Sequence, residues 1–364
     1  MPILYRYCIM GKNVLLINNG YPSELYPEYT TYISSIEECI TASGRSVSKL
    51  VIRFERPITP FYKLYKYFLF WLKCATIRTD CDILYINHLP YAFPLILNPF
   101  IKHKKVVVHW HGNELTGNGK FVQMVNSFLA RFVRKAQNIV PSLYFSRKLQ
   151  TRFGKYGLRI AVSPSGGVDT SKFSPSAIVR QNFAIGYSSE FIKDKGADIF
   201  LYLIKKCSEI ERLTGRTIEF HYIKYGSELS TYLPLLNKFD TKTVKGYAKM
   251  PKADMPAFLN STDLLVFPSQ RQGESLGLAA LEAMSCGVPV VAHNICAFPE
   301  YIKPGVSGEL VEIKDSESDQ NRAFMAAVVK AIKNIGKYSP RSVVEAHYSQ
   351  ASVISFYRNL FDTL

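Results

Sequence analysis

Short apolar runs alternate along the first half of the chain with segments whose apolar residues recur every three or four positions. Thr30–Ser43 and Phe121–Lys135 have this helical spacing. The apolar runs, which have the length of buried strands, are Val14–Asn19, Val47–Ile52, Ile83–Asn87, Val106–His109 and Asn138–Pro141. Strands that alternate with helices predict parallel β-α-β units and a doubly wound α/β sheet.

The second half of the chain repeats this alternation. Its expected strands are Phe183–Tyr187, Ile218–Ile223, Leu264–Pro268 and Val288–Ala292, and its expected helices include Leu276–Met284 and Ala323–Ile335. Ser163–Pro175 is rich in Gly, Pro and Ser, so we expect the boundary between two domains there. Ligands of open α/β sheets bind beyond the carboxyl ends of the strands, and two such domains facing each other would form one cleft.

The length and composition agree with two folded domains. The chain has 364 residues, more than the ~250–300 residues of a single core. Of these residues 47% are apolar and 13% aromatic, a composition that excludes disorder. Seven cysteines without a C-x-x-C pair argue against a zinc ribbon or a disulfide framework and favour a reduced, cytoplasmic chain. Met1–Asn19 contains Arg6 and Lys12, so we expect no signal peptide.

Positive charge is concentrated in the first half of the chain. Residues 1–168 hold 22 Lys and Arg against 8 Asp and Glu, a net charge of +14, whereas residues 169–364 hold 23 against 21, a net charge of +2. A polyanionic partner is therefore expected for the first half. Nucleic acid and an anionic membrane surface are the two candidates.

The segment Arg56–Arg78 combines basic and aromatic residues and contains no acidic residue. We expect an interfacial helix on anionic lipid, with these side chains at the membrane surface: Lys63, Lys66, Trp71 and Lys73. The alternative is a half-buried helix with a basic face. RNA contact is disfavoured because no RNA- or DNA-binding signature accompanies the segment.

Ser269–Ala292 (SQRQGESLGLAALEAMSCGVPVVA) is the most informative run of the chain. Glu274 lies in a loop after a strand, Gly277 lies where a helix opens, and Glu282 lies on that helix about 7 Å farther along its axis. The N–H groups of a helix N-terminus suit a phosphate, and a carboxylate accepts hydrogen bonds from vicinal hydroxyls. This one segment therefore has groups for a sugar, a pyrophosphate and a ribose.

These residues resemble the E-x7-E motif of glycosyltransferase family 4. Further similar segments are VHWHG (108–112), PSGGVDTSKFSP (164–175), SSEFIKDKG (188–196), PEYIKPGVSGELV (299–311) and YSQASVISFYRNLF (348–361). The resemblance implies the GT-B fold, two Rossmann-like domains facing across a cleft. It implies an acceptor and membrane domain of residues 1–165, completed by a C-terminal helix at 348–364 that crosses back, and a nucleotide-sugar donor domain of residues 166–347.

Matching the motifs position by position implies roles for single residues. His111 would lie beside the donor sugar and Glu274 would contact the hydroxyls of the transferred sugar, which makes these two the catalytic candidates. Lys195 would neutralise the donor diphosphate, and Glu282 would hold the ribose. The backbone amides expected to contact sugar and phosphate are those of Leu276, Gly277 and Leu278.

Two positions depart from the family pattern. An ungapped alignment places Glu190 where the family usually has Arg, and Tyr26–Tyr29 stands where a Gly pair lies near the donor phosphate. The departures predict a shifted diphosphate, compensation by another basic residue, or reduced activity. Asp80-Cys81-Asp82 spells the D-x-D of metal-dependent transferases, but it precedes a strand, so we expect a turn and no metal site.

The expected function is that of a retaining, metal-independent glycosyltransferase without a further cofactor, acting on a nucleotide-diphospho-sugar. The acceptor is expected to be a lipid-linked saccharide or polysaccharide in bacterial surface polysaccharide synthesis, such as that of lipopolysaccharide. The enzyme is expected on the inner face of the cell membrane, bound to anionic lipid and not to nucleic acid. Two alternatives stay open: an inactive GT-B binding module at the membrane, and a GT-B nucleotide-sugar epimerase.

Overall fold

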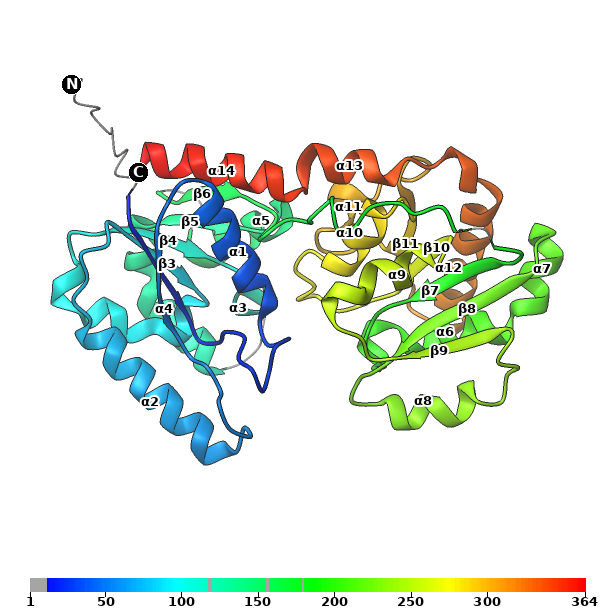
Figure 1. Cartoon of the computed structure of the whole chain (residues 1–364), viewed down its shortest axis with the longest axis horizontal. Coiled ribbons are helices and arrows are strands. Elements are labelled where there is room, and N and C mark those ends of the chain that lie inside the picture. Colours follow the sequence, from blue (N-terminus) through cyan, green and yellow to red (C-terminus); the bar gives the residue numbers. More distant parts are fainter. Residues whose placement is uncertain (1–11, 117–119, 155–156, 179) are drawn as a thin grey trace, which may run out of the picture. The chain divides into compact units, whose positions relative to one another are not determined.

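The computed structural model describes residues 12–116, 120–154, 157–178 and 180–364, so Arg6 lies outside the described residues. The chain divides into two compact units (Figure 1). Unit 1 comprises Met1–Pro141, Ser146–Gly166 and Val353–Leu364. Unit 2 comprises Ser142–Phe145 and Gly167–Ser352.

Unit 1 is built on a parallel six-stranded sheet of order β2-β1-β3-β4-β5-β6. The strands are β1 (Val14–Asn18), β2 (Val47–Val51), β3 (Ile83–Asn87), β4 (Lys105–His109), β5 (Gln137–Val140) and β6 (Arg159–Val162). The first five confirm the expected strands to within one residue at each end. The edge strand β6 was not expected, because its apolar run, 160–162, has only three residues and none of its four residues is fully buried.

Helices cover both faces of this sheet, as the parallel connections require. They are α1 (Thr31–Ala42), α2 (Pro60–Thr76), η1 (Leu89–Leu97), η2 (Pro99–Ile101), α3 (Asn113–Thr116), α4 (Lys120–Lys135), α5 (Leu143–Phe153) and α14 (Gln350–Thr363). Val353, Tyr357 and Phe361 of α14 are buried in the same core cluster as α1. The end of the chain therefore returns to unit 1, as the resemblance implied.

Unit 2 repeats the architecture with the sheet order β12-β11-β10-β7-β8-β9. Its strands are β7 (Phe183–Tyr187), β8 (Ile218–Lys224), β9 (Val244–Ala248), β10 (Leu264–Phe267), β11 (Val290–His293) and β12 (Gly308–Val311). Its helices are η3 (Lys193–Lys195), α6 (Ala197–Lys205), α7 (Cys207–Thr214), α8 (Leu229–Leu236), η4 (Lys252–Asp254), α9 (Met255–Asn260), α10 (Leu278–Ser285), α11 (Phe298–Tyr301), α12 (Glu317–Lys333), η5 (Ile335–Lys337) and α13 (Pro340–His347).

Two helix starts in unit 2 differ from the expected ones. Helix α12 begins at Glu317 and not at Ala323, because the Ser316 side chain accepts a hydrogen bond from the N–H of Asp319 and caps the helix. Helix α10 begins at Leu278 and not at Leu276, because Gly277 precedes it with a φ of +65°, outside the helical range.

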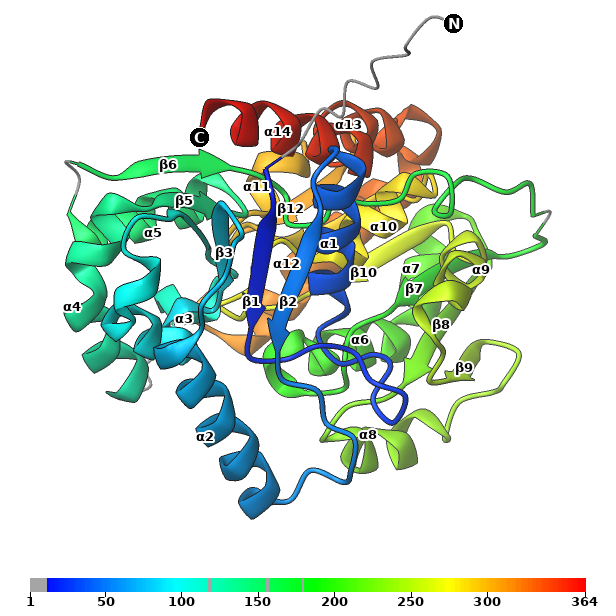
Figure 2. The ribbon, with the colours of Figure 1, turned by 60° about the vertical axis from the view of Figure 1, so that its left-hand side comes forward.

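Helix α2 projects from the rest of unit 1, as Figures 1 and 2 both show. It has 17 residues, but only Phe70 and Cys74 among them are fully buried. Within the described part of the chain, no helix has the length and apolar character needed to cross a membrane.

Candidate active site

The carboxyl ends of β3 and β4 bring Asn87 and His111 together in unit 1. The two strands are neighbours, with Asn87 paired to His109 in the register, so residues just after them meet at one edge. His111 Nε2 lies 2.9 Å from Asn87 Oδ1, and Asn87 Nδ2 donates to the carbonyl of Ile17. Because the amide oxygen accepts, His111 carries its proton on Nε2, and Nδ1 is left as an acceptor.

His111 is held neutral by its surroundings. Burial lowers the pKa of His111 well below its usual range, and the neighbouring His109 and His88 lower it further. The ring centroids of these two histidines lie 4.4 and 4.7 Å from that of His111. Burial also lowers the pKa of His109, to about 3. His111 can therefore exchange hydrogen bonds with a sugar hydroxyl but does not supply a positive charge.

A hydrogen-bonded chain of Glu114, His88 and Tyr32 adjoins His111. His88 Nδ1 lies 2.6 Å from Glu114 Oε1, and His88 Nε2 lies 2.6 Å from the Tyr32 hydroxyl. Burial by itself would raise the pKa of Glu114, but His88 and backbone N–H donors outweigh it and lower that pKa below the usual value. The carboxylate orients His88, whose φ of +49° is rare for a residue with a side chain.

Four of these residues were not among the site residues expected from the sequence: Asn87, His88, Glu114 and Tyr32. Asn87 ends β3 and His88 follows it directly, and β3 lies next to β4, which leads to His111. The position of these two residues could therefore have indicated a place in the site. Glu114 follows His111 by three residues and gave no separate signal.

The start of helix α10 presents unpaired donors in unit 2. A Cβ on Gly277 would lie 2.6 Å from a ring atom of Phe298, so only glycine fits this approach. The Tyr301 hydroxyl donates to the carbonyl of Leu276 at 2.6 Å and fixes the turn. Among the described residues, no acceptor faces the backbone N–H groups of Leu276, Gly277, Leu278 and Ala279. Such a group of donors suits an anion or hydroxyl oxygens.

Lys195 and Glu274 meet beside this helix start. Lys195 Nζ lies 2.5 Å from Glu274 Oε2, and the Ser269 hydroxyl donates to the same oxygen at 2.9 Å. The two side chains are 15% and 11% exposed, so their charges are only partly hydrated. Gly196, with a φ of +78°, lets the turn that carries Lys195 press against the carbonyl of Pro268 at the end of β10. Both residues were expected at the site from the sequence, and the structure brings them into contact.

Glu282 is a buried carboxylate on α10. Burial raises its pKa, and the ammonium group of Lys252, with Nζ 3.6 Å from Glu282 Oε1, partly offsets this. Lys252 was not expected at the site, because it lies in η4 after β9, far from Glu282 in the sequence. A buried carboxylate with one nearby cation retains lone pairs for vicinal hydroxyls.

The two departures from the family pattern have distinct local structures. Glu190 is exposed, and its backbone carbonyl accepts a hydrogen bond from the Tyr187 hydroxyl. In the loop that stands for the Gly pair, Tyr29 packs edge-on against Phe54. Thr30 follows with a φ of +54°, a conformation in which glycine is usual.

Helix α2, which carries the residues expected at a membrane surface, has an exposed stripe of apolar side chains, which we call the α2 stripe. Its side chains are each more than half exposed: Phe61, Leu64, Tyr65, Phe68 and Leu72. Lys63 and Lys73 are exposed beside it, whereas Lys66 Nζ lies 3.6 Å from Glu55 Oε2.

The place of Trp71 must be corrected. Its indole N–H donates to the carbonyl of Tyr91 at 2.8 Å, and its ring packs against Phe93. These contacts hold Trp71 against η1, so it does not belong to the exposed stripe.

The D-x-D residues have a structural contact in unit 1. The carboxylate of Asp82 accepts a hydrogen bond from the backbone N–H of Asn13 at 3.0 Å, which joins the turn before β3 to the start of β1. Across the described ranges, no group of three or more His, Cys, Asp and Glu side chains is arranged to hold a metal ion.

Comparison with known proteins finds similarity to glycosyltransferases. Residues 169–333 match the family described as "Glycosyl transferases group 1". An "Uncharacterized 41.2 kDa protein in cps region" of Klebsiella pneumoniae is 30% identical over 235 residues, which are 62% of each chain. The "Capsular polysaccharide biosynthesis glycosyltransferase CapM" of Staphylococcus aureus is 23% identical over 190 residues, 51% of this chain and 47% of that protein. The chain thus spans about half to three fifths of these relatives.

A solved structure matches nearly the whole fold. Anabaena HepE in complex with UDP-glucose has a TM-score of 0.68 and 18% identity, over 97% of this chain and 100% of that chain. At this identity the similarity establishes the fold, two parallel Rossmann-like sheets in GT-B order.

Proposed function

Because residues 169–333 match the group 1 glycosyltransferases and the chain has the GT-B fold, we propose that it transfers a sugar from a nucleotide-diphospho-sugar to a saccharide hydroxyl. The observation that carries the proposal is the arrangement of Lys195, Glu274 and the unpaired N–H groups at the start of α10. These groups provide a cation, a carboxylate and backbone donors within one small region. A diphosphate joined to a sugar needs all three.

Unit 2 binds the donor in this proposal. Lys195 and the N–H groups of Leu278 and Ala279 hold the diphosphate, and Glu274 accepts hydrogen bonds from the sugar hydroxyls. The carboxylate of Glu282 accepts from the two hydroxyls of the ribose. The raised pKa of Glu282 does not prevent this, because Lys252 supports the charged form.

The proposed reaction retains the configuration at the anomeric carbon and needs no metal ion. The bond between the anomeric carbon and the diphosphate oxygen breaks, and its electron pair leaves with the diphosphate. The acceptor oxygen bonds to the same face of the carbon, and its proton passes to the departing diphosphate. Lys195 and the α10 N–H groups stabilise the negative charge that develops on the leaving group.

His111 is the proposed catalytic residue of unit 1. As a neutral imidazole with Nε2–H directed to Asn87, it has a free acceptor at Nδ1 for a donor-sugar hydroxyl. The Glu114–His88–Tyr32 chain is proposed to position this group by fixing the rings packed around it.

The acceptor is proposed to be a lipid-linked saccharide or polysaccharide in bacterial surface polysaccharide synthesis. The capsule-related relatives support the pathway class, and the exposed α2 stripe with Lys63 and Lys73 supports a place on the inner face of an anionic membrane. Apolar side chains of such a helix enter the headgroup region, and lysines reach anionic lipid.

A non-catalytic membrane-docking module is the second candidate. It is favoured by Glu190 and by the Tyr26–Tyr29 loop, which remove a cation and a close backbone approach from the expected phosphate site. A nucleotide-sugar epimerase would convert one nucleotide-sugar into another, without net release of the free nucleotide and without forming a glycoside.

The deciding experiment begins with a thermal-shift screen of nucleotide-diphospho-sugars. A donor present at ~100 times its Kd adds about 2.7 kcal/mol of stability. The donor that binds is then incubated with lipid-linked saccharides, with and without EDTA, and the product is analysed by NMR. We expect a new glycoside of the donor's anomeric configuration in both conditions. Donor binding without any glycoside would favour the docking module.

A further inference from the structure

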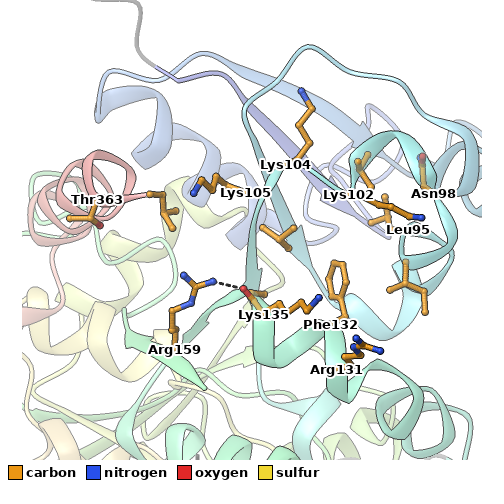
Figure 3. A pocket seen from close by; sticks show the side chains of 15 residues that line it. Leu95, Asn98, Lys102, Lys104, Lys105, Arg131, Phe132, Lys135, Arg159 and Thr363 are labelled. Carbon is orange, nitrogen blue, oxygen red and sulfur yellow. Dashed lines mark hydrogen bonds between the residues drawn. The ribbon is translucent and has the colours of Figure 1, made fainter. Parts of the chain in front are cut away.

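Unit 1 contains a cavity at the edge of its sheet opposite to His111. It has a volume of about 720 Å³ and lies where β4, β5 and β6 begin (Figure 3). Lys105 opens β4 and His109 closes it, so the two edges are about 13 Å apart along that strand. The cavity is therefore separate from the histidine cluster of the candidate active site.

The cavity is strongly basic. Six of its fifteen lining residues are cationic, and none of the fifteen is Asp or Glu: Lys102, Lys104, Lys105, Arg131, Lys135 and Arg159. In the described part of the chain, no carboxylate forms an ion pair with any of the six. Arg159 is hydrogen bonded to the backbone carbonyl of Lys135, which leaves its charge uncompensated (Figure 3).

The helix dipole explains only part of this charge. Lys135 lies in the last turn of α4, where a cation stabilises the helix. Lys102 and Lys105 lie outside any α-helix, and Arg159 starts a strand. The positive charges of these side chains repel one another around one cavity, and an anion bound between them would offset this repulsion.

The cavity floor is apolar. It is formed by these side chains: Leu95, Ile101, Val106, Phe132 and Ala136. Its size is that of an ordinary small-ligand site. The cations suit a phosphate group, and the apolar floor suits the apolar part of an amphiphile that carries it. The same cations also suit a small soluble phosphate compound.

We propose that this cavity binds an anionic phosphate group, either in the headgroup of an anionic lipid or in a soluble phosphate ligand. The site would be additional to the donor diphosphate site, because every residue that lines it belongs to unit 1. It also lies apart from the α2 stripe, since no residue of α2 lines it.

The test measures hydrogen–deuterium exchange in the segments 95–106, 131–136 and 159–162 of the full chain. The probes are inorganic pyrophosphate, vesicles of phosphatidylglycerol with phosphatidylcholine, and vesicles of phosphatidylcholine alone. The pocket variant carries Lys102→Glu, Lys105→Glu and Lys135→Glu. The matched control, with the same change in net charge, carries Lys205→Glu, Lys242→Glu and Lys337→Glu at exposed positions of unit 2.

We expect pyrophosphate or the anionic vesicles to slow exchange in these segments of the parent and of the control. In the pocket variant the affinity should fall at least about tenfold, since each lost charged hydrogen bond has roughly that effect. Slowing by pyrophosphate identifies a soluble ligand, and slowing by the anionic vesicles alone identifies a lipid headgroup.

Two outcomes would overturn the proposal. One is unchanged exchange in these segments of the parent with both probes. The other is equal slowing in the pocket variant and the control. If the Glu variant does not fold by circular dichroism, Lys102→Gln, Lys105→Gln and Lys135→Gln replace it, with the same expected loss of binding.

Discussion

Lys195 and Glu274 are bound to each other, with Nζ and Oε2 2.5 Å apart, although the proposed function assigns them to different parts of one donor. The pair keeps both side chains close to the start of α10 while neither contacts a substrate. A donor that binds there exchanges this ion pair for contacts with diphosphate and sugar. Each residue thus provides the opposite charge that partners the other, and removing one leaves the other without this ion-pair partner.

Replacing Lys195 by Met should weaken donor binding by roughly tenfold to a hundredfold, because a charged partner of the diphosphate is lost. Lys195→Arg should restore part of the affinity. Calorimetric titration with the donor measures this. The control is Lys193→Met in the same 3-10 helix, whose side chain is 72% exposed and should tolerate the change. Equal losses in Lys193→Met and Lys195→Met would contradict the assignment.

Glu282→Gln should weaken donor binding and make the protein less sensitive to pH. Because burial raises the pKa of Glu282, the native state keeps the proton to a higher pH than the unfolded chain does. The parent therefore loses stability as the pH rises through the range between the two pKa values, and the Gln variant should lose less. Thermal unfolding at pH 4.5 and pH 7.5 measures the difference, with Glu317→Gln, an exposed carboxylate, as the control.

Identical pH dependence in the parent and Glu282→Gln would contradict the buried, proton-retaining state of this carboxylate. Unchanged donor affinity in the same variant would instead contradict its proposed contact with the ribose.

His111→Gln should make the protein more resistant to acid. The pKa of His111 is lowered by burial, so on acidification the unfolded chain binds a proton at about 6.5 that the native state does not bind. The parent thus loses up to about 2 kcal/mol of stability at pH 5 through this residue, at ~1.4 kcal/mol per pH unit. Urea unfolding at pH 7.5 and pH 5 measures the change, and His103→Gln, an exposed histidine, is the control.

The same variant should lose most of its transferase activity at every pH between 5 and 8, because the proposed role uses the neutral ring. An activity profile of the parent with an acid limb that His111→Gln abolishes would mean that His111 titrates, contrary to its assigned state.

Most of the fold was predictable because its strands are continuous apolar runs. β1, β3 and β7 are buried at every position, and such strands are visible in the sequence. β6 was missed, because half-buried edge strands lack this pattern.

The candidate site was predictable where one segment holds several of its parts. Glu274, Gly277 and Glu282 lie within nine residues, so their spacing was informative. Lys252 and the Glu114–His88–Tyr32 chain come together only through tertiary packing. Trp71 was misplaced, because its aromatic character is equally typical of a membrane surface and of a contact with η1.

The α2 stripe should bind anionic membranes through its lysines as well as its apolar side chains. Lys63→Glu with Lys73→Glu should weaken binding to phosphatidylglycerol vesicles at least about 30-fold at low salt, from about 1 kcal/mol per lysine. Vesicle sedimentation measures this. The control pair Lys205→Glu with Lys242→Glu in unit 2 should bind as the parent does. If the α2 variant bound the vesicles as tightly as the parent does, the proposed membrane role of its lysines would be contradicted.

The central claim is that Glu274 acts on the sugar being transferred, and turnover of Glu274→Gln at saturating donor tests it most directly. The variant keeps the size of the side chain but removes its charge, which is needed as positive charge develops on the sugar. We predict that the rate of nucleoside diphosphate release in the presence of acceptor falls at least about a hundredfold, roughly 2.7 kcal/mol of transition-state stabilisation, with little change in donor KM. Turnover equal to that of the parent at saturating donor would contradict the account.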